Sequence, residues 1–430
     1  MALNKDYTKH IGRIVTPSLG SDPELFIATT SGTVIGAEKV IPKGGLFGGS
    51  QGMAKPSIVL DGVQVELHPR PDHCRARIAN DFKAIFTKLD QQLKEKGASA
   101  SFNPVVTLSK DEMASLSKAA QQLGCAPSRN VYDPNATIKV PKGFRMRSAG
   151  GHIHVSAVTY NREGTRSECI NSTPQKIERF VKICDLFLGI PGVLLDRDPQ
   201  AAVRRKVYGR ASEHRTPSYG IEYRVLSNYW LRSYQLMSFV YGMARQSCNV
   251  FAKGITYPAI NNQWDGAEEL FRRVDFEKVR KAINTNNVDM AWKQWDGIES
   301  FIEEFCVDGQ SGLWSGESLP SFRFFAKKVQ EKGLEYWFPE DPMTHWTNIP
   351  EGHTENDKGY AGWETYLIKA VQDKRVDVEV DDVIARLTAP IVINAPRPTR
   401  KRIPKVAPKP GISVAALATN LMSNLKGAAV

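Results

Sequence analysis

Acidic, imidazole and guanidinium side chains recur in this sequence at the spacing of β-strands. His152 and His154 alternate with aliphatic residues, and Glu222 and Arg224 alternate with apolar residues in the same way. Successive side chains of a strand point to opposite faces, so each segment predicts one polar and one apolar face. Such groups are costly to gather unless a metal ion or a phosphate binds to them. The pattern therefore indicates a nucleotide-and-metal site.

Two segments nearer the start of the chain have the same design. Residues 22–27 read as a short strand with Asp22 and Glu24 on one face, and a later strand places Glu66 on its polar face. Pro23 cannot donate a hydrogen bond within a sheet, which confines it to a strand start, an edge or a bulge. One sheet with a concave wet face and helices behind it would satisfy all of these segments.

Each of these residues also has an ordinary explanation when it is taken alone. A His-x-His pair is often structural, and Glu222 with Arg224 could form a surface ion pair of little energetic value. The basic run that contains Arg204 and Arg205 could be a solvated face, although Lys55 after a glycine-rich loop remains a candidate for binding phosphate. The joint pattern favours a functional site, because ordinary explanations for all of these residues would require six separate coincidences.

Three helices are expected to cover the dry face of the sheet. The segment 76–95 has apolar residues at helical spacing, and the run from Tyr229 is apolar nearly all round. Thr173 with Pro174 predicts a helix start, and the sequence at 189–191, Gly-Ile-Pro, is expected to stop that helix. Beyond residue 256 we expect a helical region in which tryptophans serve packing.

Composition indicates a protein that is neither secreted nor spans a membrane. The six cysteines are scattered without a C-x-x-C pair, the start of the chain has no apolar signal region, and no stretch approaches the roughly 20 apolar residues of a membrane span. We therefore expect a cytoplasmic protein. The formal charge of +11 includes six positive residues in the Pro-rich segment 397–409, which leaves +5 for the rest and predicts an anionic partner for this tail.

Five motifs occur in an order that resembles a known family. They are Gly20–Phe26, Asp61–Glu66, Gly150–His154, Arg204–Gly209 and Arg215–Arg224. Together they resemble the phage-type carboxylate–amine ligases of type 2, a branch of the glutamine synthetase and glutamate–cysteine ligase superfamily. The resemblance covers roughly residues 18–255. It implies an α+β fold with a curved, mostly antiparallel sheet of the glutamine synthetase type.

The resemblance also implies roles for single residues and a division of the chain. Metal ligands correspond to Asp22, Glu24, Glu66, His152 and Glu222. Nucleotide phosphates or a substrate carboxylate correspond to Arg204, Arg205, Arg210 and Arg215. Arg224 corresponds to the guanidinium that stabilises the transferring phosphoryl group, with Glu66 and His154 as candidate general bases. The expected parts are a ligase core at 1–255, a mainly helical region at 256–394 and a basic tail at 395–430.

The implied reaction is an ATP-dependent ligation with Mg²⁺ or Mn²⁺. A carboxylate is a poor electrophile, so ATP would convert it to an acyl phosphate, which an amine attacks to give an amide, ADP and phosphate. The substrates would be a small-molecule or peptide carboxylate and an amine, and an oligomer is compatible with the sequence. If the chain is phage-encoded, the site of action is the host cytoplasm. Two rival functions are a metal-dependent phosphotransferase and a nucleic-acid or virion-binding protein with a vestigial ligase site, which the basic tail favours.

Overall fold

The computed structural model of this 430-residue chain describes most of its first 349 residues. The described ranges are 17–47, 55–121, 128–135, 144–156, 158–160, 166–261, 266–306 and 318–349. All of them lie in the first of two units into which the chain divides, Met1–Thr388 and Ala389–Val430. The basic tail and the end of the glycine-rich loop, 48–52, lie outside the described residues.

The first sheet is antiparallel and joins strands from distant parts of the chain. In order across the sheet these are β1 (Ser18–Ser21), β9 (Ile153–Ser156), β13 (Ile221–Tyr223) and β12 (His214–Arg215). Its register places Gly20 opposite His154 and His154 opposite Glu222. Side chains directly opposite one another share a face, so the polar faces predicted around His154 and Glu222 are one continuous face.

The second sheet carries the other two acidic segments. Its strands, in order, are β3 (Val34–Ile35), β2 (Glu24–Thr29), β5 (Gln64–His68) and β4 (Ser57–Asp61), and β6 (Ala98–Ser101) also pairs with β2. All of these pairs are antiparallel. The fold is therefore mixed α+β with antiparallel sheets, as predicted.

The expectation of a single sheet for all four segments is wrong. The chain leaves the first sheet after Ser21 and enters the second at Glu24, and the intervening Pro23 has no N–H with which to continue the ladder. Two backbone hydrogen bonds of 2.9 Å join the sheets at this corner, from Glu24 to the Gly150 carbonyl and from Leu67 to the Pro23 carbonyl. The two sheets thus adjoin at Asp22 and Pro23.

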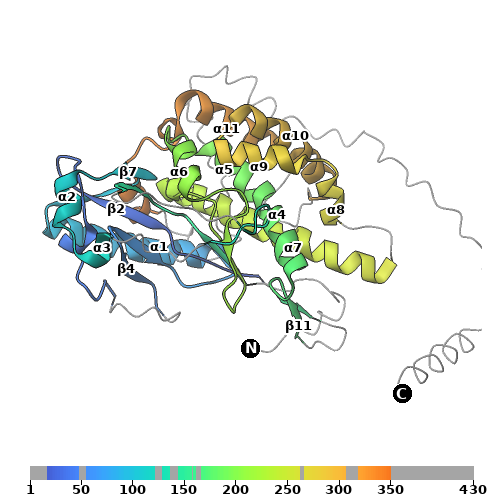
Figure 1. Ribbon diagram of the computed structural model, residues 1–430, viewed down its shortest axis with the longest axis horizontal. Helices are drawn as coiled ribbons and strands as arrows, with labels where there is room; N and C mark the ends of the chain where they lie inside the picture. Colours follow the sequence, from blue (N-terminus) through green and yellow to red (C-terminus); the bar gives the residue numbers. More distant parts are fainter. Residues whose placement is uncertain are drawn as a thin grey trace, which may run out of the picture. The chain divides into compact units, whose positions relative to one another are not determined.

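The helices predicted behind the strands are present and cover them. They are α1 (Arg75–Glu95), α4 (Pro174–Cys184) and α7 (Tyr234–Asn261). Figure 1 shows the three helices. Helix α1 packs on β4 and β6, α4 on β13, and α7 on β1 and β9. The apolar stripe of α1 is buried throughout, with Phe82 and Phe86 fully inaccessible to solvent. This burial of apolar area holds the strands that present the site.

Helix α4 begins where the sequence predicts but does not end there. The Thr173 side chain accepts a hydrogen bond from the Lys176 N–H, and Pro174 follows in the first turn. The predicted stop at 189–191 is wrong, because the chain continues through a π turn, η3 (Asp185–Gly189), into α5 (Ile190–Leu195). The Ile190 N–H donates to the Asp185 carbonyl five residues back, and the wider turn lets the helix proceed past Pro191.

The remaining helical elements include every described element beyond residue 261. They are α6 (Ala201–Val207), η4 (Asn228–Arg232), α8 (Gly266–Phe271), α9 (Phe276–Thr285), α10 (Val288–Phe305), α11 (Ser318–Lys332), η5 (Leu334–Tyr336) and α12 (Pro342–Thr347). Trp295, Trp337 and Trp346 are buried, which confirms their packing role. The predicted boundary at residue 255 falls within α7.

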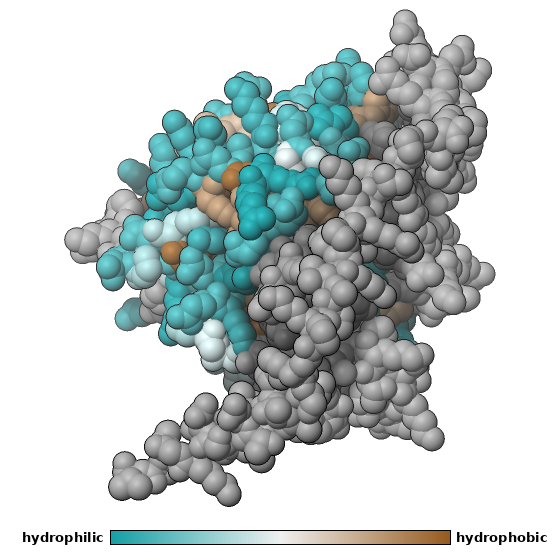
Figure 2. All heavy atoms as spheres, turned by 90° about the vertical axis from the view of Figure 1, so that its right-hand side faces the viewer, coloured by the Kyte–Doolittle hydropathy of each residue, from teal (hydrophilic) through white to brown (hydrophobic). Residues whose placement is uncertain are grey.

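Shorter elements complete the described part of the chain. They are η2 (Ala37–Lys39), α2 (Lys110–Ser115), α3 (Lys118–Gln121), and the hairpins of β7 (Val105–Thr107) with β8 (Met146–Ser148) and β10 (Val158–Tyr160) with β11 (Arg166–Cys169). On the face shown in Figure 2 the described residues are mainly hydrophilic. Within the described ranges, no helix combines the length and the apolar character that crossing a bilayer requires.

Candidate active site

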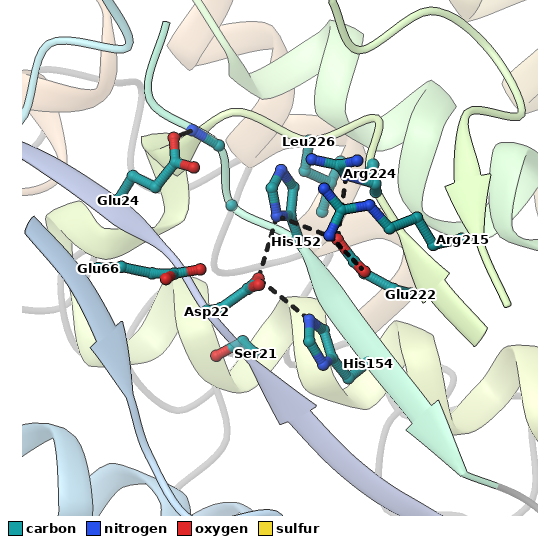
Figure 3. A network of polar contacts seen from close by, with 12 residues as sticks. Ser21, Asp22, Glu24, Glu66, His152, His154, Arg215, Glu222, Arg224 and Leu226 are labelled. Atoms are coloured by element: carbon teal, nitrogen blue, oxygen red, sulfur yellow. Dashed lines mark hydrogen bonds and ion pairs between the residues drawn. The ribbon is translucent and has the colours of Figure 1, made fainter. Parts of the chain in front are cut away.

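The candidate site begins with a row of side chains across the first sheet. His154 on β9 lies opposite Glu222 on β13, and Glu222 lies opposite Arg215 on β12. Register alone therefore makes an imidazole, a carboxylate and a guanidinium neighbours on one face. His152 and Arg224 follow on the same face at a spacing of two residues (Figure 3).

Asp22 supplies a carboxylate beside the two imidazoles. Its Oδ1 lies 3.0 Å from Nδ1 of His152 and 3.0 Å from Nε2 of His154 (Figure 3). Burial acts to raise the pKa of Asp22, but attraction to His154 and His152 outweighs it and holds this pKa well below its usual range. Burial lowers the pKa of His152, whereas in His154 the same effect is outweighed by Asp22 and the pKa is raised. The pairing of Asp22 with His154 thus favours their charged forms.

Glu222 is buried among cationic groups. Its Oε1 lies 3.0 Å from Nε of Arg224 and 3.6 Å from Nδ1 of His152, and its Oε2 lies 3.6 Å from Nη1 of Arg215. Glu222 is 4% exposed and Arg224 is fully buried. A buried guanidinium needs such a partner, because an isolated buried charge is very costly.

A second group of carboxylates lies on the neighbouring sheet. Glu24 and Glu66 are directly opposite in the register of β2 with β5, and Asp61 ends the adjoining strand β4. Burial, reinforced by the charge of Asp61, raises the pKa of Glu24 to about 8, although Glu24 accepts hydrogen bonds from the Gly150 N–H at 2.6 Å and from Gln64 at 2.5 Å. Burial also raises the pKa of Glu66 to about 7 and that of Asp61 above its usual value.

The first group fits a divalent cation. Ligand atoms of Asp22, His154 and Glu222 all lie within 4.8 Å of one another. Asp22 also raises the pKa values of Glu24 and Glu66 through like-charge repulsion, so the second group is electrostatically coupled to the first. Buried carboxylates with raised pKa values gain stability from a nearby cation, and carboxylate oxygens and imidazole nitrogens are both common ligands of divalent metal ions.

Comparison with known families gives the region an identity. Residues 138–253 match the family described as phage phiEco32-like COOH.NH2 ligase-type 2. These residues are therefore similar to the type 2 carboxylate–amine ligases. A search of curated proteins found no match to the chain. The family match confirms the resemblance seen in the sequence, over a shorter range than the expected 18–255.

The ligase region does not contain the whole candidate site. His152, His154, Glu222 and Arg224 lie within the matched residues, whereas Asp22 precedes them. The earlier strands are nevertheless integral to the ligase region in space, because β1 pairs with β9 along its full length. The site is therefore completed by strands outside the matched range.

Four residues that were predicted to bind phosphate have other surroundings in the structure. Arg204 is 1% exposed, and its two terminal nitrogens donate to the Val225 and Leu226 carbonyls at 3.0 Å each. Arg205 is also buried and donates to the Gly209 carbonyl at 2.9 Å. Both guanidiniums thus have main-chain partners, and the phosphate contacts predicted for them stay predictions.

The other two predicted cations are nearer to solvent. Arg210 is partly buried and pairs with Glu213 at 2.8 Å. Lys55 is exposed immediately before β4. Of the basic residues named from the sequence, Arg215 and Arg224 are those that the structure brings beside Glu222.

Two tyrosines that the sequence analysis did not assign hold the imidazoles. The Tyr208 hydroxyl lies 2.5 Å from Nε2 of His152, and the Tyr219 hydroxyl lies 2.7 Å from Nδ1 of His154. The ring of Tyr219 also stacks on His154 with centroids 5.9 Å apart. Both tyrosines lie in the motifs that carry the resemblance, each followed by glycine, so their positions were visible although their roles were not.

A cavity of about 500 Å³ opens on the first group of the ligase site. Asp22, His154 and Glu222 line it together with Arg129, Arg215 and Tyr219. Arg129 was not predicted from the sequence, because it lies outside every motif and reaches the cavity through a bridge with His214 on the sheet edge. Carboxylates and guanidiniums thus line the same cavity.

Proposed function

We propose that this chain is an ATP- and Mg²⁺- or Mn²⁺-dependent carboxylate–amine ligase that forms an amide through an acyl-phosphate intermediate and releases ADP and phosphate. One observation carries this proposal: side chains from two sheets, among them Asp22, His154 and Glu222, converge beside the fully buried Arg224. The matching family consists of ligases by its description, which supports the same reaction class.

The surroundings of the site residues support a different role for each of them. Asp22, His154 and Glu222 would hold the cation, with Glu24 and Glu66 close by. His154 suits this role because Tyr219 holds Nδ1 and leaves Nε2 directed at Asp22. A bound Mg²⁺ or Mn²⁺ ion would neutralise charge on the phosphate oxygens of ATP.

Arg224 would stabilise the transferring phosphoryl group. Its Nε is fixed by Glu222 at 3.0 Å, one terminal nitrogen donates to the Ser128 hydroxyl at 3.2 Å, and its guanidinium lies 5.2 Å from the centre of the Tyr208 ring. These contacts preorganise the guanidinium, so little reorganisation is needed when negative charge develops.

Glu66 is the better candidate for removing a proton from the amine. Burial raises its pKa to about 7, and a base is most effective when its pKa lies near the working pH. His68 lies 3.1 Å from Glu66 and can receive or return the proton. His154, the other base predicted from the sequence, would then be committed to the cation.

The cavity favours a substrate that carries an anionic group besides the reacting one. Arg129 is exposed, lines the cavity and has no ion-pair partner within the described ranges. A substrate carboxylate at Arg129 and Arg215 would leave the reacting end near Asp22 and Glu222. We therefore propose an amino acid or a peptide end as one of the two substrates.

We also propose a fold type, a cellular location and a partner for the protein. The core would have a fold of the glutamine synthetase type and act in the cytoplasm, in the host cell if the chain is phage-encoded. The basic tail would bind an anionic partner, and assembly into an oligomer is compatible with the site.

Phosphate release tests the proposal directly. Purified protein is incubated with ATP, Mg²⁺ and pooled amino acids and amines, and the products are identified by mass spectrometry. We expect substrate-stimulated phosphate release and an amide product, both lost in Glu222→Ala and retained in Glu331→Ala, which changes an exposed residue of α11. A phosphorylated product without an amide would instead identify a phosphotransferase, and equal activity of Glu222→Ala would exclude this site.

A further inference from the structure

A buried acid lies behind the strand that presents the candidate site. Asp185 is the first residue of the π turn between α4 and α5, and none of its surface is exposed. π turns are rare and occur frequently at functional sites. Asp185 cannot touch a substrate from this position, so any function it has must act through its neighbours.

One contact of Asp185 reaches the centre of β13. Its Oδ1 accepts a hydrogen bond of 2.8 Å from the hydroxyl of Tyr223. Tyr223 lies between Glu222 and Arg224, and its side chain points to the opposite face of the strand. A fixed Tyr223 therefore fixes the rotation of the strand that directs Glu222 and Arg224 into the site.

The same oxygen holds a second segment. It accepts a hydrogen bond of 2.9 Å from the N–H of Ser212, a residue with φ of +62° that few non-glycine residues adopt. The Ser212 hydroxyl donates to Asn130 at 2.9 Å and accepts from the Val131 N–H at 3.0 Å. Asp185 thus also fixes the backbone next to Arg129.

The segments that Asp185 contacts both lead to Arg224. The residue after Ser212 is Glu213, whose carbonyl accepts the N–H of Arg224 at 2.9 Å. Two residues before Asn130, the Ser128 hydroxyl accepts from the Arg224 side chain at 3.2 Å. Arg224 is therefore held through its own backbone and its side chain by segments that Asp185 joins.

The π turn also brings the helix unusually close to Tyr223. A Cβ atom added to Gly189 would lie 2.8 Å from the Tyr223 hydroxyl and 2.7 Å from Cδ1 of Ile283. The φ of Gly189 is −64°, so space and not backbone conformation demands glycine here. The sequence Asp185 to Gly189 is thus built to receive the tyrosine hydroxyl.

We propose that Asp185 is a positioning residue of the ligase site, which through Tyr223 and Ser212 sets the orientation of Glu222 and Arg224. This inference rests on the proposed function, since it assigns Asp185 to the same site. Asp185 contributes no group to the reaction. Its role is to hold two segments at the spacing that the cation and the phosphoryl group would require.

Tyr223→Phe tests the inference, because it removes one hydroxyl and keeps the ring. The readouts are kcat and KM for ATP, Mn²⁺ affinity by electron paramagnetic resonance, and the melting temperature. We expect kcat to fall and the Mn²⁺ dissociation constant to rise, each by roughly tenfold or more, as for residues that orient metal ligands. Asp185→Asn should shift both values in the same direction by less, since a neutral amide oxygen is a weaker acceptor.

Trp346→Phe is the control for a loss of stability alone. Trp346 lies on α12, which packs on α1 and η4. The substitution removes a buried hydrogen bond from the Trp346 indole to the Leu231 carbonyl of η4. Its melting temperature should fall while Mn²⁺ affinity stays unchanged. The inference is overturned if Tyr223→Phe and Asp185→Asn behave like this control.

The readouts also separate this inference from the proposed function. If the wild type releases no phosphate but binds Mn²⁺, the ligase proposal fails while the Mn²⁺ affinities of the variants still decide the role of Asp185. If the wild type shows neither phosphate release nor Mn²⁺ binding, both proposals fail, because there is no site to position.

Discussion

Glu24 and Glu66 are cross-strand partners, directly opposite each other where β2 pairs with β5. Like charges in this relationship destabilise a sheet, and burial makes the repulsion stronger. Both glutamates therefore favour the protonated form, and their pKa values are raised to about 8 for Glu24 and about 7 for Glu66.

This pair predicts that the metal-free protein loses stability as pH rises. The folded state binds more protons than the unfolded state between the ordinary glutamate pKa of 4.5 and the raised pKa of about 8, so the free energy of unfolding decreases across that interval. Melting temperatures measured in EDTA from pH 5 to pH 8.5 check this. Glu24→Gln should flatten the curve, and identical slopes in both proteins would contradict the assignment.

Addition of a divalent cation should reverse that loss. A ligand that binds only the folded state stabilises it by about 2.7 kcal/mol at a concentration of 100 times its dissociation constant. We expect Mn²⁺ to raise the melting temperature more at pH 8 than at pH 6, because protons compete with the ion for the carboxylates. Asp22→Asn should abolish the increase. Asp90→Asn on α1 serves as the control, and an unchanged increase in Asp22→Asn would remove Asp22 from the ligand set.

Arg224→Gln should lower substrate-stimulated phosphate release on the order of 10³-fold, as for arginines that stabilise a transferring phosphoryl group. The buried contacts of Arg224 to Glu222 and Ser128 use its fork of donors, so Arg224→Lys should not restore the rate. Arg323→Gln on α11 removes a guanidinium distant from the site and should keep full activity. A loss of less than tenfold in Arg224→Gln would show that Arg224 does not contact the phosphoryl group.

Arg129→Gln should raise KM for an anionic substrate and leave kcat nearly unchanged. A hydrogen bond to a charged group contributes about 1.5–3 kcal/mol, which corresponds to roughly a tenfold or larger change in KM. The measurement compares each active amino acid with its amide. Wild type should prefer the carboxylate, Arg129→Gln should lose that preference, and Arg272→Gln should retain it. An equal preference in wild type and Arg129→Gln would place the substrate carboxylate elsewhere.

The polar faces could be predicted from the sequence, but their register could not. Alternation identifies His154 and Glu222 as residues of one kind of face, because the period of a strand is visible in a few residues. Their direct opposition depends on which residues pair, and no local pattern contains that information. Arg129 could not be found at all, since it joins the cavity only through pairing with His214.

The errors in the predicted fold have local physical causes. Pro23 is recognisable as a break in the ladder, yet only the pairing of β2 with β5 shows that it separates two sheets. The Gly-Ile-Pro sequence at 189–191 is typical of a helix end, and the π turn that carries the helix past it depends on tertiary contacts of Asp185. Arg204 and Arg205 are buried and donate to main-chain carbonyls, which no local pattern in the sequence reveals.

Asp22 and Pro23 form the corner between the two sheets. The angle at this corner determines the distance between the carboxylates of the first group and those of the second group. Proline fixes φ near −65°, and two backbone hydrogen bonds of 2.9 Å brace the corner, so this distance has little freedom to increase. Calcium needs longer and more numerous oxygen contacts than magnesium does. Because the corner is stiff, we expect the site to bind Mg²⁺ more tightly than the larger Ca²⁺.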